Sequence, residues 1–299
     1  MTQRIEPGSI IVGVDGSDDS GRALRWAAEQ AAREHRPLAV VTAAPVTQLN
    51  ALALAGAAST YVAGTDALME GARSVAAGAA ESVQLVRPGL ATTAHAVQGD
   101  PREVLIELSR DAHLVVMGSR GRGVFRSRLL GSVSANVLRR AHSPVVVCRP
   151  ESPGQVRRGI LVGADGTTEG RAVLQFAFEL ASMRELPLTV LHSFHDVIAA
   201  VNGPQLVSAA EAFVEEERLL LAESVAGFAE RFPEVWVDLQ LARGFAHECL
   251  AVDSQRWHLI VVGRHPTDSV GRMMSSTVAT AVVERAHTTV AVVPVPPAV

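Results

Sequence analysis

The sequence has little aromatic content, no excess of basic residues and no apolar run of membrane-spanning length. Aromatic residues make up 4 % of the 299 positions, and the formal net charge is −4. Neither value favours nucleic-acid binding, which uses stacked rings for single strands and basic surfaces for phosphate backbones. A spanning helix needs about 20 apolar residues. We therefore expect no nucleic-acid partner and no membrane partner.

Cysteine is also scarce. Cys148 lies in an apolar run and Cys249 on an expected helix, so two buried free thiols are favoured over a disulfide. Low cysteine usage suits a reducing compartment. The first residues, MTQRIEPGSIIVGVDGS, place charged and turn residues before a short strand-like run and do not resemble a signal peptide. We expect a soluble, cytoplasmic protein.

The sequence shows no motif for three kinds of catalytic site: a phosphate-binding hydrolase loop, a nucleophile activated by histidine, and a metal centre. The GxxxxGK[ST] loop is absent, and with it the lysine and the metal-binding hydroxyl of that hydrolase class. No Ser-His-Asp or Cys-His set is legible. His192 and His195 bracket one expected strand end, where a surface position is favoured over a metal site. His142 and His287 occupy matching places between helix and strand, which favours a structural role. The sequence predicts no efficient catalytic centre and no metal site.

The chain does contain a tandem repeat. VGVDGS at 12–17 aligns with VGADGT at 162–167, an offset of 150, and further along Gly118 aligns with Gly263, an offset of 145. Between the copies, residues 149–154 read RPESPG, which is typical of an exposed linker. We predict two domains, 1–150 with an intact motif and 151–299 with a degenerate one.

Each copy alternates short apolar runs with longer helical patterns. The runs are nearly continuous in Val, Ile and Leu, which is typical of strands buried on both faces of a parallel sheet. Helices between the strands imply βαβ units and an open α/β sheet. In the first copy the expected strands are Ser9–Val14, Leu38–Ala44, Thr92–Val97, His113–Met117 and Pro144–Arg149, and the expected helices are Ser20–Arg33, Asp66–Val86, Pro101–Arg110 and Ser132–Arg140. The Ala- and Gly-rich connection Pro45–Thr65 is interpreted as a mobile flap over the ligand site or as a surface loop without a role.

Residues 114–134, LVVMGSRGRGVFRSRLLGSVS, run from a strand through a glycine-rich loop into a helix. Glycine at 118, 121 and 131 allows positive φ and a close approach to a ligand, and backbone N–H groups at the helix start favour phosphate. Ser132 and Ser134 add hydroxyls. Turn glycines and N-cap residues would explain each position alone, but the combined spacing favours a phosphate site. Four arginines of the loop would attract anions or simply lie on a solvated face: Arg120, Arg122, Arg126 and Arg128.

Asp15 follows the first strand. Its carboxylate could accept hydrogen bonds from ribose hydroxyls or an adenine amine, or it could cap the next helix. Ser17, Asp18 and Asp19 could cap that helix equally well, which leaves Asp15 available for a ligand.

The G-x2-G-x9-G-[S/T] spacing, the VGVDGS start and Gly99-Asp100-Pro101 together resemble the universal stress proteins that bind ATP. The resemblance spans nearly the whole chain as two copies. It implies two flavodoxin-like (Rossmann-like) domains, each with an open five-stranded parallel sheet in the order 3-2-1-4-5. By similarity, Asp15 would touch the nucleoside and Val41 would meet adenine through its backbone. Ribose and phosphates would be held by Gly118, Gly121, Gly131, Ser132, Val133 and Ser134.

The function implied is an ATP-binding stress-response regulator, with or without Mg²⁺, rather than an enzyme. AMP or a cyclic nucleotide would share most contacts. A slow ATPase, or an interaction scaffold with a vestigial site, is the alternative.

The second copy departs from this pattern. Asp165 and Gly263 are kept, but Pro266 replaces Gly121 and Ser276 replaces Gly131, while Thr277 matches Ser132. Proline removes an N–H donor, and a Cβ obstructs close approach. We expect the second half to bind nucleotide weakly or not at all. Its role would be assembly: the family pairs its fifth strands, so residues 144–149 could pair with 289–294 in an intrachain pseudo-dimer, and whole chains could form a homodimer.

Overall fold

The computed structural model describes residues 4–45, 58–121, 130–150, 157–208, 211, 214–265 and 270–296, with the backbone alone at 58–63, 197, 200 and 270–277. The chain divides into two compact units, Met1–Arg149 (unit 1) and Pro150–Val299 (unit 2). In the described part of the chain, no helix is both long and apolar enough to cross a membrane.

Unit 1 is built on five parallel strands. Their order, β3-β2-β1-β4-β5, confirms the predicted 3-2-1-4-5 sheet. Every residue of β4 and β5 is buried, as expected for continuous apolar runs covered by helices on both faces. The strands are β1 (Ile10–Gly13), β2 (Leu38–Ala44), β3 (Thr92–Gln98), β4 (Leu114–Gly118) and β5 (Val145–Cys148).

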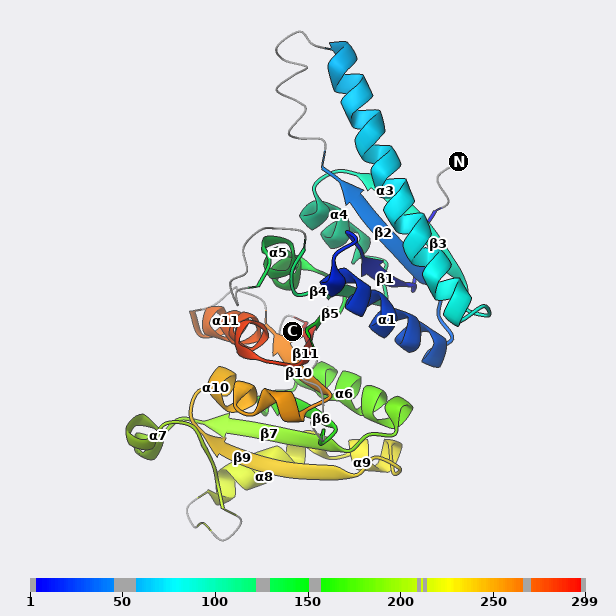
Figure 1. Ribbon diagram of the computed structural model, residues 1–299. Coiled ribbons are helices and arrows are strands. Elements are labelled where there is room, and N and C mark those ends of the chain that lie inside the picture. The colour runs from blue at the N-terminus through cyan, green and yellow to red at the C-terminus, as the bar shows by residue number, and fades with distance from the viewer. Residues whose placement is uncertain are drawn as a thin grey trace. The chain divides into compact units, whose positions relative to one another are not determined.

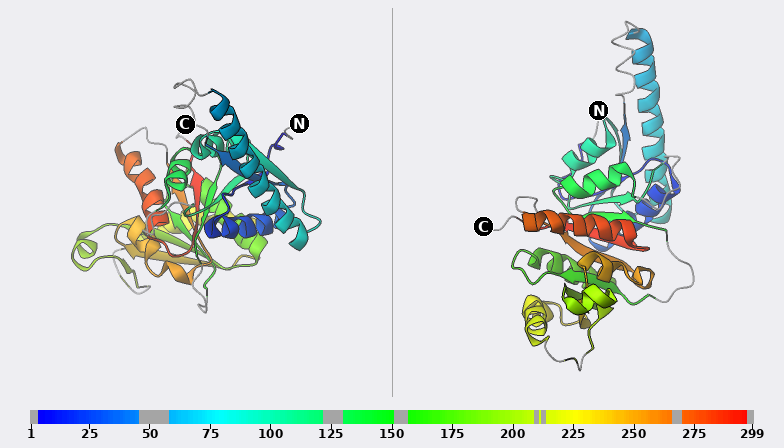
Figure 2. Two further views of the ribbon diagram at one scale, coloured as in Figure 1. Left: turned by 45° about the horizontal axis from the view of Figure 1, so that its top comes forward. Right: turned by 90° about the vertical axis from the view of Figure 1, so that its left-hand side faces the viewer.

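Two helices of unit 1 cover each face of this sheet. Helices α1 (Asp18–Arg33) and α3 (Ala58–Val86) pack on one face, and α4 (Pro101–Leu108) and α5 (Ser132–Arg140) on the other (Figure 1). Helix α3 is long and projects past the carboxyl end of β2 (Figures 1 and 2). Since α3 begins at Ala58, the end of the expected loop Pro45–Thr65 is helical instead, as its alanine content favours. The rest of that loop, 46–57, lies outside the described residues.

Unit 2 repeats the architecture with one addition. Its parallel strands run in the order β9-β7-β6-β10-β11, and the short β8 (Gln205–Leu206) pairs antiparallel with β9. The parallel strands are β6 (Ile160–Ala164), β7 (Leu188–Phe194), β9 (Val237–Arg243), β10 (Leu259–Arg264) and β11 (Thr289–Pro294). The helices are α6 (Arg171–Arg184), α7 (Val197–Asn202), α8 (Glu215–Val225), α9 (Phe228–Arg231), α10 (Ala246–Ala251) and α11 (Val270–Arg285), with a 3₁₀ turn at Ser254–Arg256. The pairing of 144–149 with 289–294 and the homodimer stay predictions.

Both cysteines are free. Cys148 is buried and Cys249 half-buried, and burial raises the pKa of the Cys249 thiol to about 11. Neither environment favours a reactive thiolate.

The matched histidines have a structural role in both units. The backbone N–H of His142 donates to Ser109 Oγ at 2.9 Å, and the N–H of His287 donates to Ser254 Oγ at 2.9 Å. Both serines are fully buried. Each hydroxyl therefore satisfies a backbone donor between the last helix and the last strand of its unit.

Replacing either serine by alanine should leave that N–H without its partner. Ser109→Ala and Ser254→Ala should each lower the free energy of unfolding by about 1–3 kcal/mol, measured by urea denaturation. Ser82→Ala, at an exposed helix position, is the control. Equal stability of all three variants would contradict the role given to the buried serines.

Candidate functional site

A cavity of about 970 Å³ opens at the carboxyl ends of the unit 1 strands, where parallel α/β sheets bind their ligands. Its wall includes the ends of β1, β2 and β4, the loop after β4, the start of α5 and parts of α3 and α4. All eight residues expected at the site line it: Asp15, Val41, Gly118, Gly121, Gly131, Ser132, Val133 and Ser134.

The three glycines are needed for close packing rather than for unusual backbone angles. A Cβ on Gly118 would lie 2.7 Å from the Asp19 carbonyl carbon, and one on Gly121 would lie 2.6 Å from Asp15 Oδ2. A Cβ on Gly131 would lie 3.3 Å from the Ser119 carbonyl oxygen. None of the three adopts positive φ, so that expectation is wrong. The backbone instead packs directly against neighbouring polar groups.

The start of α5 faces the cavity without a side-chain cap. Gly131 is the N-cap residue, and no side-chain hydrogen bond covers this end. The first N–H groups of a helix have no intrahelical partner, so those of Ser132 and Val133 can donate to an anion. Ser134 differs from the expectation, because its buried hydroxyl donates to the Gly118 carbonyl at 2.9 Å. Its proton is therefore used in joining α5 to β4.

Asp15 and Val41 contribute in different ways. Asp15 Oδ1 accepts the Ser17 N–H at 3.0 Å, while Ser17 caps α1, so Asp15 is not the helix cap. Val41 lies in the middle of β2, and its carbonyl accepts the Val14 N–H at 2.9 Å. The backbone contact expected for Val41 therefore has to compete with the sheet. Its side chain is the part that can pack against a ring.

One arginine of the glycine-rich loop can be placed. Arg120 is half-buried and lines the cavity. Arg122, Arg126 and Arg128 lie outside the described residues.

Much of the cavity wall was not foreseen from the sequence. It comes from the end of β2, one side of α3, the apolar side of α4 and Met117 of β4. The recurrence of small residues at helical spacing within 67–74 is the one signal that could have indicated the α3 part. These residues are Thr42, Ala43, Ala44, Pro45, Ala67, Leu68, Gly71, Ala72, Ser74, Val75, Pro101, Leu105 and Met117.

In unit 2 the matching place is occupied by the protein's own groups. Asp165, the counterpart of Asp15, forms an ion pair with His265, with 2.6 Å between Oδ2 and Nε2. A Cβ on Gly166 would clash with Leu220 of α8, so that side chain lies directly on the turn after β6. His192 hydrogen-bonds Glu217 at 3.2 Å. His265 and Leu220 were not foreseen, because neither has a counterpart in the motif.

The glycine-rich loop is also remodelled in unit 2. Helix α11 begins at Val270, although its first residue by analogy with α5 would be Thr277. Ser276 therefore lies inside a helix instead of at the N-cap position that Gly131 has. Pro266 lies outside the described residues.

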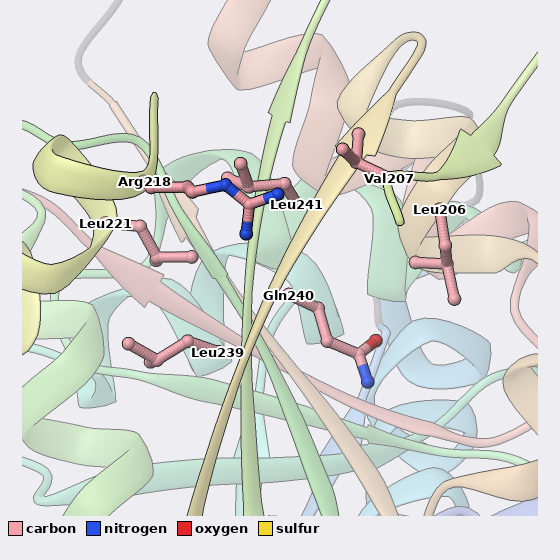
Figure 3. Close-up of a pocket in the computed structure, with 7 residues that line it drawn as sticks. All are labelled: Leu206, Val207, Arg218, Leu221, Leu239, Gln240 and Leu241. Carbon is pink, nitrogen blue, oxygen red and sulfur yellow. The ribbon is translucent and has the colours of Figure 1, made fainter. Parts of the chain in front are cut away.

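Unit 2 has a smaller hollow elsewhere. It measures about 340 Å³ and lies between α8 and the β8–β9 pair (Figure 3). Four leucines and Arg218 are among the residues that line it (Figure 3). The Nη2 of Arg218 donates to the Ser208 carbonyl at 2.9 Å. It has neither the glycine-rich loop nor the strand-end carboxylate of the unit 1 cavity.

Comparison with known proteins agrees with two copies of one α/β architecture. A family model described as the Universal stress protein family matches residues 8–149 and again 157–294. The chain belongs to the universal stress protein family. A universal stress protein of Mycolicibacterium smegmatis is 32 % identical over 303 residues, covering 98 % of this chain and 99 % of that one. One from Mycobacterium tuberculosis is 33 % identical over 291 residues, covering 95 % and 96 %.

A solved structure shares the fold over the same length. The universal stress protein from Archaeoglobus fulgidus superposes with a TM-score of 0.67 at 20 % identity, covering 96 % of each chain. Both halves of this chain therefore carry the family's fold.

Gly118→Ala should destabilise unit 1, because the added methyl group would meet the α1 backbone. We expect a loss of about 1–3 kcal/mol. Gly78→Ala is the control, since a Cβ on Gly78 meets nothing within 4 Å and should raise helix stability by about 0.5–1 kcal/mol. Denaturant unfolding measures both, and a neutral Gly118→Ala would show that the close approach is unimportant.

The pH dependence of unit 2 should reflect the Asp165–His265 pair. Burial alone would raise the pKa of Asp165, but hydrogen bonds from His265 and Thr167 outweigh it and hold that pKa below its usual value. A depressed carboxylate pKa stabilises the fold above the unfolded value, about 3.9, and this stabilisation is lost as pH falls through the folded value. His265→Ala should therefore lower stability near neutral pH and weaken the loss of stability on acidification. Parallel urea titrations of both proteins across this range measure the difference, and identical pH profiles would contradict it.

Proposed function

We propose that the protein binds one ATP in unit 1 and acts as a nucleotide-dependent stress-response regulator. The observation that carries the proposal is the convergence in one cavity of an uncapped helix start and a strand-end carboxylate. Gly121 brings the loop backbone close to Asp15, so the glycine-rich loop and the strand-end carboxylate are neighbours in this cavity. Membership of the universal stress protein family supports the same reading.

The cavity offers a separate chemistry to each part of a nucleotide. The N–H groups at the start of α5, together with Arg120, suit phosphate oxygens. Asp15 suits ribose hydroxyls, which are hydrogen-bond donors. Leu105 and Met117 offer an apolar surface to a purine ring. The phosphate end and the nucleoside end of the ligand are thereby oriented.

The output proposed is conformational rather than chemical. The sequence lacks the lysine-containing loop of the common nucleotide hydrolases, so phosphate release would be slow or absent. Bound nucleotide would draw the backbone around Gly121 and the start of α5 together. That change would alter a surface that other components of the cell can recognise.

Asp15→Ala should weaken ATP binding by roughly 10- to 100-fold, the cost of losing charge-assisted hydrogen bonds to the nucleoside. Asp165→Ala is a matched control, because Asp165 accepts the N–H of Thr167 as Asp15 accepts that of Ser17. It should leave the affinity unchanged. Isothermal titration calorimetry, with and without Mg²⁺, should give one site per chain.

Two tightly bound nucleotides per chain, or equal losses in the two variants, would contradict the assignment to unit 1. Mass spectrometry of ligand released from the denatured protein distinguishes ATP from AMP and cyclic nucleotides. Steady phosphate release that Asp15→Ala abolishes would favour an ATPase over a regulator.

A further inference from the structure

The wall of the unit 1 cavity comes from both faces of the sheet. A Cβ on Gly13 would lie 3.1 Å from Leu105 of α4, and Val41 is the partner of Gly13 in the parallel register. Val41 therefore points toward α4. Because successive side chains of a strand alternate, Thr42 points to the opposite face, where α1 and α3 pack.

The α3 side of the cavity has room for a ligand group. A Cβ placed on Gly71 meets nothing within 4 Å, although Gly71 lines the cavity. Ala67, Ala72 and Ser74 of the same helix also line it. Ala67, Gly71 and Ser74 are exposed, so the cavity is open to the surface on this side, and their short side chains leave its mouth clear. Leu68, 40 % exposed, lies at the rim.

A buried hydroxyl on this side has no partner. Thr42 is 7 % exposed and lines the cavity, and its Oγ1 makes no hydrogen bond. Buried hydroxyls are normally hydrogen-bonded. An unpaired hydroxyl that lines a cavity therefore indicates a ligand group that accepts a hydrogen bond from it or donates one to it. Most of the residues that β2 and α3 contribute to the cavity wall are apolar, which disfavours a charged group.

We propose that the α3 side of the cavity is a second ligand compartment, separate from the nucleotide site. It takes an uncharged aliphatic molecule that carries one hydroxyl or carbonyl oxygen. The aliphatic part lies against Ala72, Val75 and Leu68, beside Gly71, and the oxygen hydrogen-bonds Thr42 Oγ1. The proposal does not rest on ATP binding, because the nucleotide groups lie along the α4 and α5 side.

1-Hexanol is a suitable probe, and hexanoate is its charged counterpart. Saturation-transfer NMR on the full chain should show binding of 1-hexanol but not of hexanoate. Gly71→Leu should abolish the 1-hexanol signal by filling the compartment. Gly78→Leu is the matched control: it lies on the same helix, with nothing within 4 Å of its Cβ position, and outside the cavity wall described by the structure. It should bind like the wild type.

The hydroxyl is tested by Thr42→Val, which keeps the shape of the side chain. Affinity for 1-hexanol should fall by about 2- to 12-fold, as expected for one hydrogen bond. ATP binding should be unchanged in Gly71→Leu. Thermal unfolding monitors the fold, and Gly71→Leu should melt no lower than the wild type because leucine favours a helix.

Three outcomes would overturn the proposal. The first is absence of 1-hexanol binding at millimolar concentration, and the second is equal binding by Gly71→Leu and Gly78→Leu. The third is loss of ATP binding in Gly71→Leu, which would show that the nucleotide itself occupies this compartment. If the wild type did not bind ATP, the proposed function would be refuted, but the conclusion from 1-hexanol binding would not change.

Discussion

The close approach between the end of β4 and the first turn of α1 is the constraint on which the unit 1 site depends. Gly118 permits it, since any Cβ there would meet the Asp19 backbone. Unit 2 has the same constraint with different neighbours: a Cβ on Gly263 would lie 2.9 Å from Val173 of α6. This explains why Gly118 and Gly263 agree between the copies. The first glycine serves strand–helix packing, which both folds need.

The other two glycines belong to the site and not to the fold. Gly121 contacts the Asp15 carboxylate and Gly131 begins α5. Once the second copy places residues other than glycine at these positions, α11 can extend back to Val270. A helix that starts earlier takes more backbone N–H groups into its own hydrogen bonds. A longer helix therefore accommodates the change at these two positions, and the two copies can diverge without loss of the sheet.

Sequence reasoning was strongest where a residue's role depends on local pattern. Continuous apolar runs and the repeated VGVDGS start identified the strands. Several residues that line the cavity could then be predicted, because they lie at or just after the carboxyl ends of those strands. It was weaker where tertiary packing decides. Gly118 lines the cavity as expected, but its close approach to α1 was not foreseen, and neither was the hydrogen bond that the Val41 carbonyl accepts from Val14 within the sheet. Thr42 could not be recognised, because which face a strand residue takes depends on the helices packed there.

The two units place the same strand-end carboxylate in different surroundings. In unit 2, the carboxylate of Asp165 is bonded to the ring of His265, and Leu220 covers the adjoining turn. His265 thus gives the Asp165 carboxylate the hydrogen bond that a ligand could otherwise donate. Removing either partner of such a pair leaves the other poorly compensated. In unit 1, Asp15 instead lines an open cavity beside an uncapped helix start. A ligand that binds the N–H groups at this helix start stabilises the folded form of unit 1, which makes binding and local order in unit 1 parts of one equilibrium.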